Sequence, residues 1–396
     1  GLGYAFIYSM NSLYGTSFVG NFTIINSLFI ILSTVCTLGF DTLSVKLVSS
    51  NDDNYNYLNT LYIKIITYII PITLVLSSLI YYFAENIALI FQNIDLYLPI
   101  KILSFSLLPL ALININGESF RGMKNMLFYS LYNKVFIVSV VFIIFLLMYF
   151  LNTGIHDSIN IFYYYLYAIL FLAVISTLHL KFLYMKLNNK NSDNDKVLEI
   201  QKNKLFSLSK NMLIISITFI LFQFIDILML GLLSTSEKVG IFTIIFKISS
   251  VVSIVLIGVN SISGPIISNL FSKNKLDELK KYIRNMVRIS SILTLPIILC
   301  IIYYSENILY LFGSEFIVYK YGLIIMCISQ FINVISGSVG LIMQMTGNEK
   351  IFKNIILISI ISNVLLNWIL IPKFQVLGAV YATSISLLLW NIIGVI

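Results

Sequence analysis

Charged residues are scarce in this chain of 396 residues, at 11% of the sequence, against about 25% in ordinary globular proteins. Apolar residues make up 59%, against roughly 45–50%. A soluble protein of this size cannot bury so much apolar surface and still cover itself with so few charges. The composition therefore excludes a cytosolic enzyme, a disordered chain and a fibrous repeat, and it predicts a protein that crosses a membrane several times.

Cysteine and histidine, the residues that most often form disulfides or bind metals, are also scarce. The cysteines Cys36, Cys300 and Cys327 are dispersed, with no CxxC pair, and His156 and His179 lie far apart. Neither a disulfide framework nor a metal site is indicated. No paired carboxylates face each other at helical spacing within an apolar run, and no Ser/His/Asp set shares one membrane depth. We therefore expect no enzyme activity, no metal and no cofactor.

Long apolar runs are what the sequence has in quantity. A helix needs about 20 apolar residues to cross roughly 30 Å of membrane. Continuous runs of this length predict helices, because the strands of a membrane barrel would alternate over about ten residues. We expect twelve helical segments, the first of them truncated, at residues 1–13, 19–45, 61–83, 98–119, 126–151, 159–183, 209–233, 239–267, 287–304, 319–345, 351–371 and 376–396.

Basic residues give these segments an orientation. If the N-terminal end is cytoplasmic, all but five of the 25 basic residues fall on the inner side, the exceptions being Lys101, Lys238, Lys247, Lys320 and Lys373. Lys and Arg concentrate on the cytoplasmic side of membrane proteins, so this asymmetry supports both the span count and the orientation. It also accounts for the formal charge of +8 without nucleic acid as a partner.

One inner segment has amphipathic spacing. Between Lys273 and Arg288, Leu276, Leu279, Ile283 and Met286 recur at helical intervals opposite basic residues. We expect a helix that lies flat on the anionic inner leaflet, with a solvated loop as the alternative.

An internal repeat divides the chain. Residues 19–25 (VGNFTII) recur at 239–245 (VGIFTII), Tyr62-Ile63-Lys64 recurs as Tyr282-Ile283-Arg284, and Glu85-Asn86-Ile87 recurs at 306–308. The shift is 220 or 221 residues and spans six helices, an even number, so both halves enter the membrane in the same direction. Parallel repeats of this kind indicate alternating access. We predict a six-helix lobe at 1–187, a cytoplasmic linker at 188–208, and a six-helix lobe at 209–396, which further helices would extend if the chain continues.

Several short motifs resemble polysaccharide flippases of the multidrug/oligosaccharidyl-lipid/polysaccharide (MOP) exporter superfamily. They are Tyr14-Gly15, Gly39–Thr42, Asp226–Gly231, Val239–Ile241, Lys247, Gly264-Pro265, Asn367, Ile371–Lys373, Gly378-Ala379 and Ala382-Thr383. The resemblance implies an all-α polytopic membrane protein with two parallel six-helix repeats in a V-shaped, MATE-like pair of lobes. Because family members carry twelve or fourteen spans, it leaves room for two more helices beyond Ile396.

The resemblance also implies a function. It points to a transporter in the bacterial inner membrane that moves a polyprenyl-pyrophosphate-linked oligosaccharide from the inner to the outer leaflet during O-antigen or capsule biosynthesis. Its partners would be the lipid-linked oligosaccharide and membrane lipids, with a polysaccharide polymerase and a chain-length regulator as further candidates.

Two charged residues lie inside apolar runs, where each costs about 2.5–3.5 kcal/mol to insert. Asp226 and Lys247 fall roughly 10–14 Å below the outer surface by helical rise, at matching depth on neighbouring antiparallel helices. They are expected to form a buried ion pair that fixes helix packing, or a pair that contacts the substrate or a coupling proton. The 220-residue shift places Phe6 and Ser27 at the corresponding positions of the first half, where spans one and two offer only Ser9, Asn11 and Asn26.

Other candidate binding residues are basic or carry amides. A pyrophosphate head would seek Lys or Arg, and Lys46, Arg121, Lys124, Arg284 and Arg288 cluster at inner helix ends, either as a capture mouth or simply because cytoplasmic ends are basic. Amides suit sugar hydroxyls, which makes Asn26, Asn116 and Asn260 candidates. Asn114, Asn116 and Gly117, and likewise Gly258, Asn260, Gly264 and Pro265, are expected either to break their helices beside a water-lined cavity or to mark kinks and close packing.

Three alternatives remain open. A cation-coupled multidrug exporter of the same superfamily would need a membrane carboxylate in the first half. A membrane glycosyltransferase or polymerase would need acidic residues and a large external loop. A structural or channel-like protein would leave the two repeated lobes unexplained.

Overall fold

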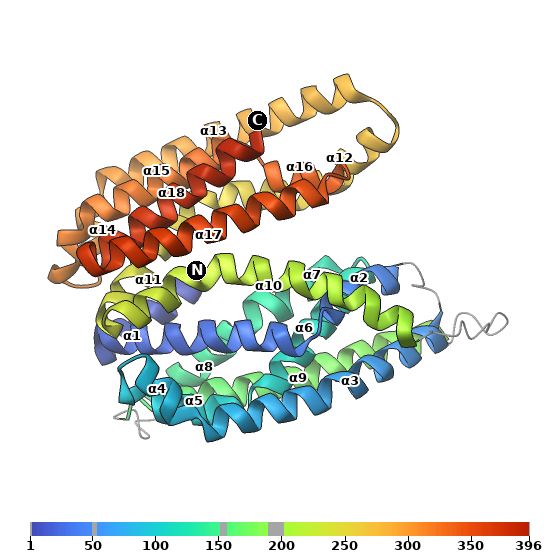
Figure 1. Ribbon diagram of the computed structural model, residues 1–396, viewed down its shortest axis with the longest axis horizontal. Coiled ribbons are helices and arrows are strands. Elements are labelled where there is room, and N and C mark those ends of the chain that lie inside the picture. The colour runs from blue at the N-terminus through green and yellow to red at the C-terminus, as the bar shows by residue number, and fades with distance from the viewer. Residues whose placement is uncertain (1, 50–53, 151–156, 189–201, 396) are drawn as a thin grey trace. The chain divides into compact units, whose positions relative to one another are not determined.

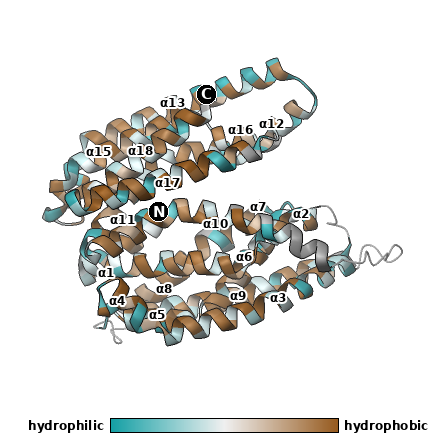
Figure 2. Cartoon of the chain, viewed as in Figure 1, coloured by the Kyte–Doolittle hydropathy of each residue, from teal (hydrophilic) through white to brown (hydrophobic). Residues whose placement is uncertain are grey.

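The computed structural model describes residues 2–49, 54–150, 157–188 and 202–395. In this part of the chain every regular element is helical (Figure 1). Apolar residues cover most of the length of the helices, while hydrophilic residues gather at helix ends and turns (Figure 2). The prediction of an all-α membrane protein is confirmed.

The candidate membrane spans follow the predicted segments closely. Nine helices of the described residues are long and apolar enough to cross a membrane, or up to eleven if two bent helix pairs each form one span. The count falls short of twelve because the first two predicted segments merge into α1 (Leu2–Cys36), whose helical geometry is interrupted only at Gly15, with φ 83° and ψ 170°. Glycine tolerates this conformation because it has no Cβ.

The described helices form two compact units. The first contains residues up to Phe6 and from Ile25 to Leu221. Besides parts of α1 and α10 (Lys202–Leu233), its elements are α2 (Phe40–Ser49), α3 (Tyr55–Tyr82), α4 (Ala84–Ile90), η1 (Ile94–Leu96), α5 (Tyr97–Ser104), α6 (Leu107–Gly122), α7 (Met126–Ser130), the π-helical turn η2 (Leu131–Val135), α8 (Phe136–Phe150) and α9 (Asn160–Asn188). The predicted linker at 188–208 falls largely outside the described residues, which omit 189–201.

The second unit contains Ile7–Ile24 and Phe222–Ile396. Its remaining elements are α11 (Ser236–Ser250), η3 (Val251–Ser253), α12 (Ile254–Ser272), α13 (Leu276–Tyr303), α14 (Ser305–Tyr310), η4 (Ser314–Tyr319), α15 (Lys320–Ile335), α16 (Val339–Met345), α17 (Glu349–Phe374) and α18 (Val376–Val395). Helices α1 and α10 thus contribute residues to both units. The lobe boundaries predicted from the repeat, 1–187 and 209–396, stay a prediction.

The repeat is visible in the order of the elements. A 28-residue helix, a short helix, a 3-10 turn and a further helix follow one another as α3, α4, η1 and α5, and again as α13, α14, η4 and α15. The long helix of each series contains a proline, Pro71 or Pro296.

The helix breaks differ from the predicted ones. Helices α6 and α12 run without interruption through Asn116-Gly117 and through Gly258, Asn260 and Gly264. Amide side chains that bond to neighbouring elements satisfy their own polar groups and leave the helical ladder intact. Breaks lie instead at Thr37–Gly39, between α1 and α2, and at Ser336–Ser338, between α15 and α16. The span that contains α6 is also bent, by 59°, at its junction with α5.

The amphipathic segment at Lys273–Arg288 is also different from the expectation. It forms the first turns of α13 and continues directly into the apolar part of that helix. Leu279 and Met286 are buried, at 6% and 5% exposure, because they pack within the second unit. The expectation of a separate helix lying flat on the membrane is therefore wrong.

Candidate functional site

Asp226 lies in a closed cage of polar side chains in the second unit. Its Oδ1 accepts hydrogen bonds from Asn363 Nδ2 at 2.9 Å and from Asn367 Nδ2 at 2.7 Å. Asn367 Nδ2 also donates to Asn363 Oδ1 at 2.9 Å, and the nearby Thr383 hydroxyl donates to the Ala379 carbonyl oxygen at 2.8 Å. Asp226, Asn363 and Asn367 are 5%, 2% and 0% exposed. We call these four residues the Asp226 cage.

Helical spacing explains how the cage forms. Asn363 and Asn367 are four residues apart on α17, so both side chains project from one face of that helix. Helix α10 supplies Asp226, and α18, which packs along α17, supplies Thr383. Helix α17 thus supplies both hydrogen-bond donors to the carboxylate of α10, and α18 places a hydroxyl beside them. Asn367 Oδ1 is the buried atom of the cage that has no hydrogen-bond partner.

The predicted ion pair between Asp226 and Lys247 is not formed: the amides of α17 are the groups that bond to the Asp226 carboxylate. Lys247 is partly buried on α11. Neutral donors satisfy the carboxylate without the second desolvation penalty that a buried ion pair brings.

A second polar cluster lies in the first unit, where α1 ends and α2 begins. Gly39 adopts φ 76°, and a Cβ at this position would lie 2.3 Å from the Ser209 carbonyl oxygen and 2.4 Å from the Leu213 amide nitrogen. Only glycine fits a left-handed turn pressed against another helix in this way. The turn places Asp41 and Thr42 in the first turn of α2, and the Thr42 hydroxyl bonds to the Ser216 hydroxyl of α10 at 2.9 Å.

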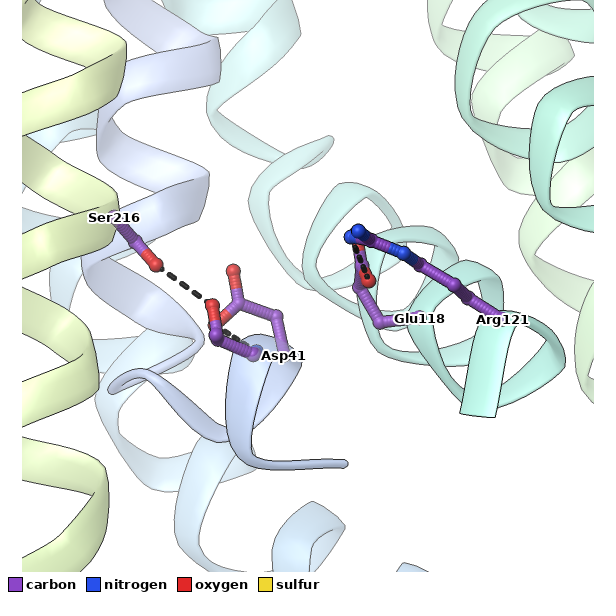
Figure 3. A network of polar contacts seen from close by, with 5 residues as sticks. Asp41, Glu118, Arg121 and Ser216 are labelled. Atoms are coloured by element: carbon purple, nitrogen blue, oxygen red, sulfur yellow. Dashed lines mark hydrogen bonds and ion pairs between the residues drawn. The ribbon is translucent and has the colours of Figure 1, made fainter. Parts of the chain in front are cut away.

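The carboxylates of this cluster are Asp41 and Glu118, which are electrostatically coupled. Asp41 accepts the Thr42 backbone N–H at 2.8 Å, and Glu118 accepts from Arg121 Nη1 at 3.3 Å (Figure 3). The Arg121 guanidinium also lies over the Tyr129 ring, 5.4 Å from its centre. Burial raises the pKa of the Asp41 carboxyl, and hydrogen bonds from Thr42 and Thr37 oppose this rise. The cluster thus combines a buried carboxyl with an ion pair between Glu118 and Arg121.

Three of the predicted basic residues are brought together at the end of α2 and α6. Gly122 is so close to α2 that a Cβ would lie 2.8 Å from Val48 Cβ and 3.1 Å from the Val45 carbonyl oxygen. The last turns of the two helices therefore lie side by side. Lys46 is in the last turn of α2, Arg121 is in the last turn of α6, and Lys124 is in the turn that follows, all with exposed side chains. We call Lys46, Arg121 and Lys124 the basic rim.

The other two basic candidates belong to the second unit. Arg284 and Arg288 lie one helical turn apart on α13 and are both exposed. They share a helix face but lie about two to three turns inside α13, not at its end as predicted, and their role in binding stays a prediction.

The amide candidates bond to the protein's own side chains. Asn116 is fully buried; it donates to Ser176 and Thr177 at 2.9 and 3.0 Å and accepts from the Tyr62 hydroxyl at 2.7 Å. Asn26 accepts from Tyr165, and Asn260 accepts from Ser338. Asn116 thus ties α3, α6 and α9 together, and its contact with a substrate stays a prediction. Asn26 and Asn260 are partly buried, and their contact with a substrate stays a prediction.

Residues that could hold a metal do not gather in the described part of the chain: no three of its His, Cys, Asp and Glu side chains form a cluster. The Asp226 cage offers one carboxylate, whose accepting oxygen is already engaged by amide donors.

The chain was compared with known protein families and structures. Residues 5–271 match the family described as polysaccharide biosynthesis protein. The chain belongs to this family. Residues 212–369 also match the MatE family, as expected for a member of the MOP superfamily. The resemblance inferred from the motifs is therefore confirmed.

A curated relative of this family member is the probable low-salt glycan biosynthesis flippase Agl15 of Haloferax volcanii, which is 28% identical over 183 residues. The matched part is 46% of this chain and 39% of the relative, so the chain spans about two fifths of that protein's length.

Solved structures show the same fold. The lipid II flippase MurJ in an inward closed conformation aligns with a TM-score of 0.74 at 15% identity, over 99% of this chain and 84% of that one. An inward-facing multidrug resistance MATE family transporter of the MOP superfamily aligns with a TM-score of 0.76 at 11% identity, over 99% and 92% of the two chains.

Sequence reasoning missed several residues of these clusters as site residues. Asp41 stands in the Gly39–Thr42 motif, and Glu118 follows the Asn116-Gly117 pair, yet neither was a candidate. The pair Asn363 and Asn367 was the available signal for the Asp226 cage, because two asparagines one helical turn apart in an apolar run are expensive unless they share a partner.

Proposed function

We propose that the chain is a transporter, not an enzyme, that moves a lipid-linked oligosaccharide across the membrane by alternating access of its two repeats. The basic rim is the observation that carries this proposal. Three exposed cations meet at one end of the α2–α6 pair, and a phosphate or pyrophosphate head is the membrane-bound anion that lysine and arginine bind best. The family, polysaccharide biosynthesis protein, and the relative, a probable glycan biosynthesis flippase, support the same substrate class.

The finer assignments are those that the family resemblance implies. The lipid carrier would be a polyprenyl pyrophosphate and the glycan a precursor of O-antigen or capsule, handed on to a polymerase and a chain-length regulator. The protein would lie in the inner or plasma membrane with its N-terminal end and the basic rim in the cytoplasm, because basic residues concentrate there. Transport would run from the inner to the outer leaflet.

The Asp226 cage argues against a cationic cargo. A drug cation needs a carboxylate that it can reach. Asp226 is buried among amides, Glu118 already pairs with Arg121, and Asp41 accepts the backbone N–H of Thr42. A multidrug exporter therefore stays the second candidate. It would be favoured if cells that lack the protein became sensitive to cationic dyes while their surface glycan stayed unchanged.

The basic rim can be tested in proteoliposomes loaded with a lipid-linked oligosaccharide. Protection of the glycan from an added glycosidase reports its leaflet. We expect the triple change Lys46→Ala, Arg121→Ala and Lys124→Ala to slow the change of leaflet at least tenfold, because the pyrophosphate loses its cationic partners. The matched control is Lys181→Ala with Lys186→Ala, two exposed lysines of α9 on the same predicted side. Equal rates for both variants would contradict the proposal.

A further inference from the structure

The two copies of the repeated VG-x-FTII motif contact each other within the second unit. A Cβ built on Gly20 would lie 1.7 Å from the Ser236 carbonyl oxygen, and one built on Gly240 would lie 2.1 Å from the Thr16 carbonyl oxygen. The 220-residue shift relates Gly20 to Gly240 and Thr16 to Ser236. Each copy therefore presents the same glycine to the same carbonyl of the other, as in the two-fold interface of a symmetric dimer.

The contact is made by small residues at helix starts. Gly15 interrupts α1, so that Thr16 opens its second helical part, and Ser236 opens α11. Thr16 with Gly20, and Ser236 with Gly240, each form a small-xxx-small pair, the pattern that lets helix backbones approach closely in membranes. Thr16 and Ser236 are 9% and 8% exposed. Backbone carbonyls touching glycine α-carbons leave no room for a side chain or for water.

A hydrogen-bonded chain extends this contact to a loop of the second repeat. Thr16 Oγ1 donates to Asn11 Oδ1 at 3.0 Å, and Asn11 Nδ2 donates to the Phe312 carbonyl oxygen at 2.6 Å. The Tyr8 ring meets the Phe312 ring edge-on, with centres 5.7 Å apart. Asn11 thus links the end of the first part of α1 to the turn between α14 and η4. The distribution of basic residues predicts which helix ends face outward. All the groups named here lie at those outward ends.

We propose that the reciprocal contact of Thr16 and Gly20 with Ser236 and Gly240 is the outer seal of the transport route. This inference rests on the proposed function. In alternating access the outer end must close while the inner end is open, and the two helix starts must separate when cargo leaves outward. Close packing of small residues against backbone suits this task, because the contact excludes water when it is closed and needs no ion pair to be broken when it opens.

The seal can be tested without transport by measuring whether a cysteine below it is reached from outside. Exposed Cys300 is first changed to serine, and Thr23→Cys, two helical turns inward of Thr16 on α1, is added as the reporter. Gly20→Leu should raise the labelling rate of this cysteine by an impermeant maleimide at least tenfold, because leucine cannot fit against the Ser236 carbonyl. Gly240→Leu should act in the same way.

The matched control is Gly258→Leu on α12, where a Cβ would meet no atom within 4 Å. It introduces the same side chain in a helix and should leave the labelling rate unchanged. Yield and thermal unfolding of each variant in detergent show whether it has folded. If Gly20→Leu folds and labels at the parent rate, or if Gly258→Leu labels as fast as Gly20→Leu, the seal is refuted.

A second pair of variants separates a backbone contact from ordinary side-chain packing. Gly20→Ala should increase labelling severalfold, and adding Ser236→Gly should not restore the parent rate, because the clash is with the Ser236 main-chain oxygen. Restoration by Ser236→Gly would overturn the proposal. If the parent protein moved no lipid-linked oligosaccharide while the labelling followed these expectations, the proposed cargo would fail and the seal would stand.

Discussion

The two repeats carry polar residues in one and apolar residues in the other at three corresponding positions. In the second repeat, Asp226 bonds to Asn363 and Asn367. In the first repeat, the 220-residue shift places Phe6, Ile143 and Leu147 at these positions, and Phe6 packs edge-on against Phe142 and Phe145 with ring centres 6.1 and 6.3 Å away. Phe6 therefore lies among aromatic rings, whereas its counterpart Asp226 lies among amides. A role of the Asp226 cage in transport stays a prediction, which the last experiment below tests.

The two repeats also differ in where their helices are interrupted. The first repeat breaks at Thr37–Gly39 and continues through Asn116-Gly117, whereas the second continues through Val259 and breaks at Ser336–Ser338. At each of these two pairs of corresponding positions, the helix is therefore interrupted in one repeat and continuous in the other. The polar groups of the first unit, Asp41 and Glu118, correspond by the same shift to the uncharged Ser261 and Ser338.

Removing the amides of the cage should have the largest effect. In the double variant Asn363→Ala with Asn367→Ala, the buried Asp226 loses both amide donors, which should lower the free energy of unfolding by about 3–5 kcal/mol, as when one partner of a buried charge is lost. Thermal or denaturant unfolding in detergent measures this. The matched control is Ile143→Ala with Leu147→Ala in the first repeat, whose side chains are 53% and 56% exposed and should matter little. Equal losses would remove the contrast between the repeats.

Exchanging residues between the two break positions should have the next largest effect. Gly39→Val places a branched side chain at φ 76° and against the Ser209 carbonyl, so it should cost more than the roughly 1–2 kcal/mol of the left-handed backbone alone. The reverse change, Val259→Gly, falls in a continuous helix and should cost only about 0.5–1 kcal/mol. If unfolding experiments gave the two changes equal costs, the breaks would not be set by local packing.

Neutralising Asp41 should have the smallest effect. Because burial raises the pKa of this carboxyl in the folded protein, its ionised form destabilises the fold at neutral pH, and this penalty fades as the pH falls through the raised pKa. Asp41→Asn should therefore unfold at a slightly higher temperature than the parent at neutral pH, with a difference that shrinks in acid. Ser261→Asn, at the corresponding uncharged position, should show no such pH dependence. A difference that grows in acid would contradict the assignment.

The sequence was sufficient for the features that depend on patterns along the chain. The apolar runs predict the spans, and the shift of 220 residues predicts the matching series of elements that begin with α3 and α13. The partner of Asp226 could not be predicted from charge, because neutral amides more than 130 positions away replaced the lysine. The break at Gly39 could not be located either, because the atoms that require glycine there belong to Ser209 and Leu213, far along the chain.

The most direct test of the account exchanges the cage for its counterpart in the first repeat. The triple variant Asp226→Phe, Asn363→Ile and Asn367→Leu replaces a buried carboxylate and its amides with apolar groups, a kind of change that is often neutral or stabilising by about 1–4 kcal/mol. In proteoliposomes the decisive measurement is the leaflet of the lipid-linked oligosaccharide. We expect a variant that folds as well as the parent but leaves the glycan in its original leaflet. Normal transport by this variant would show that the cage has no role in moving the lipid.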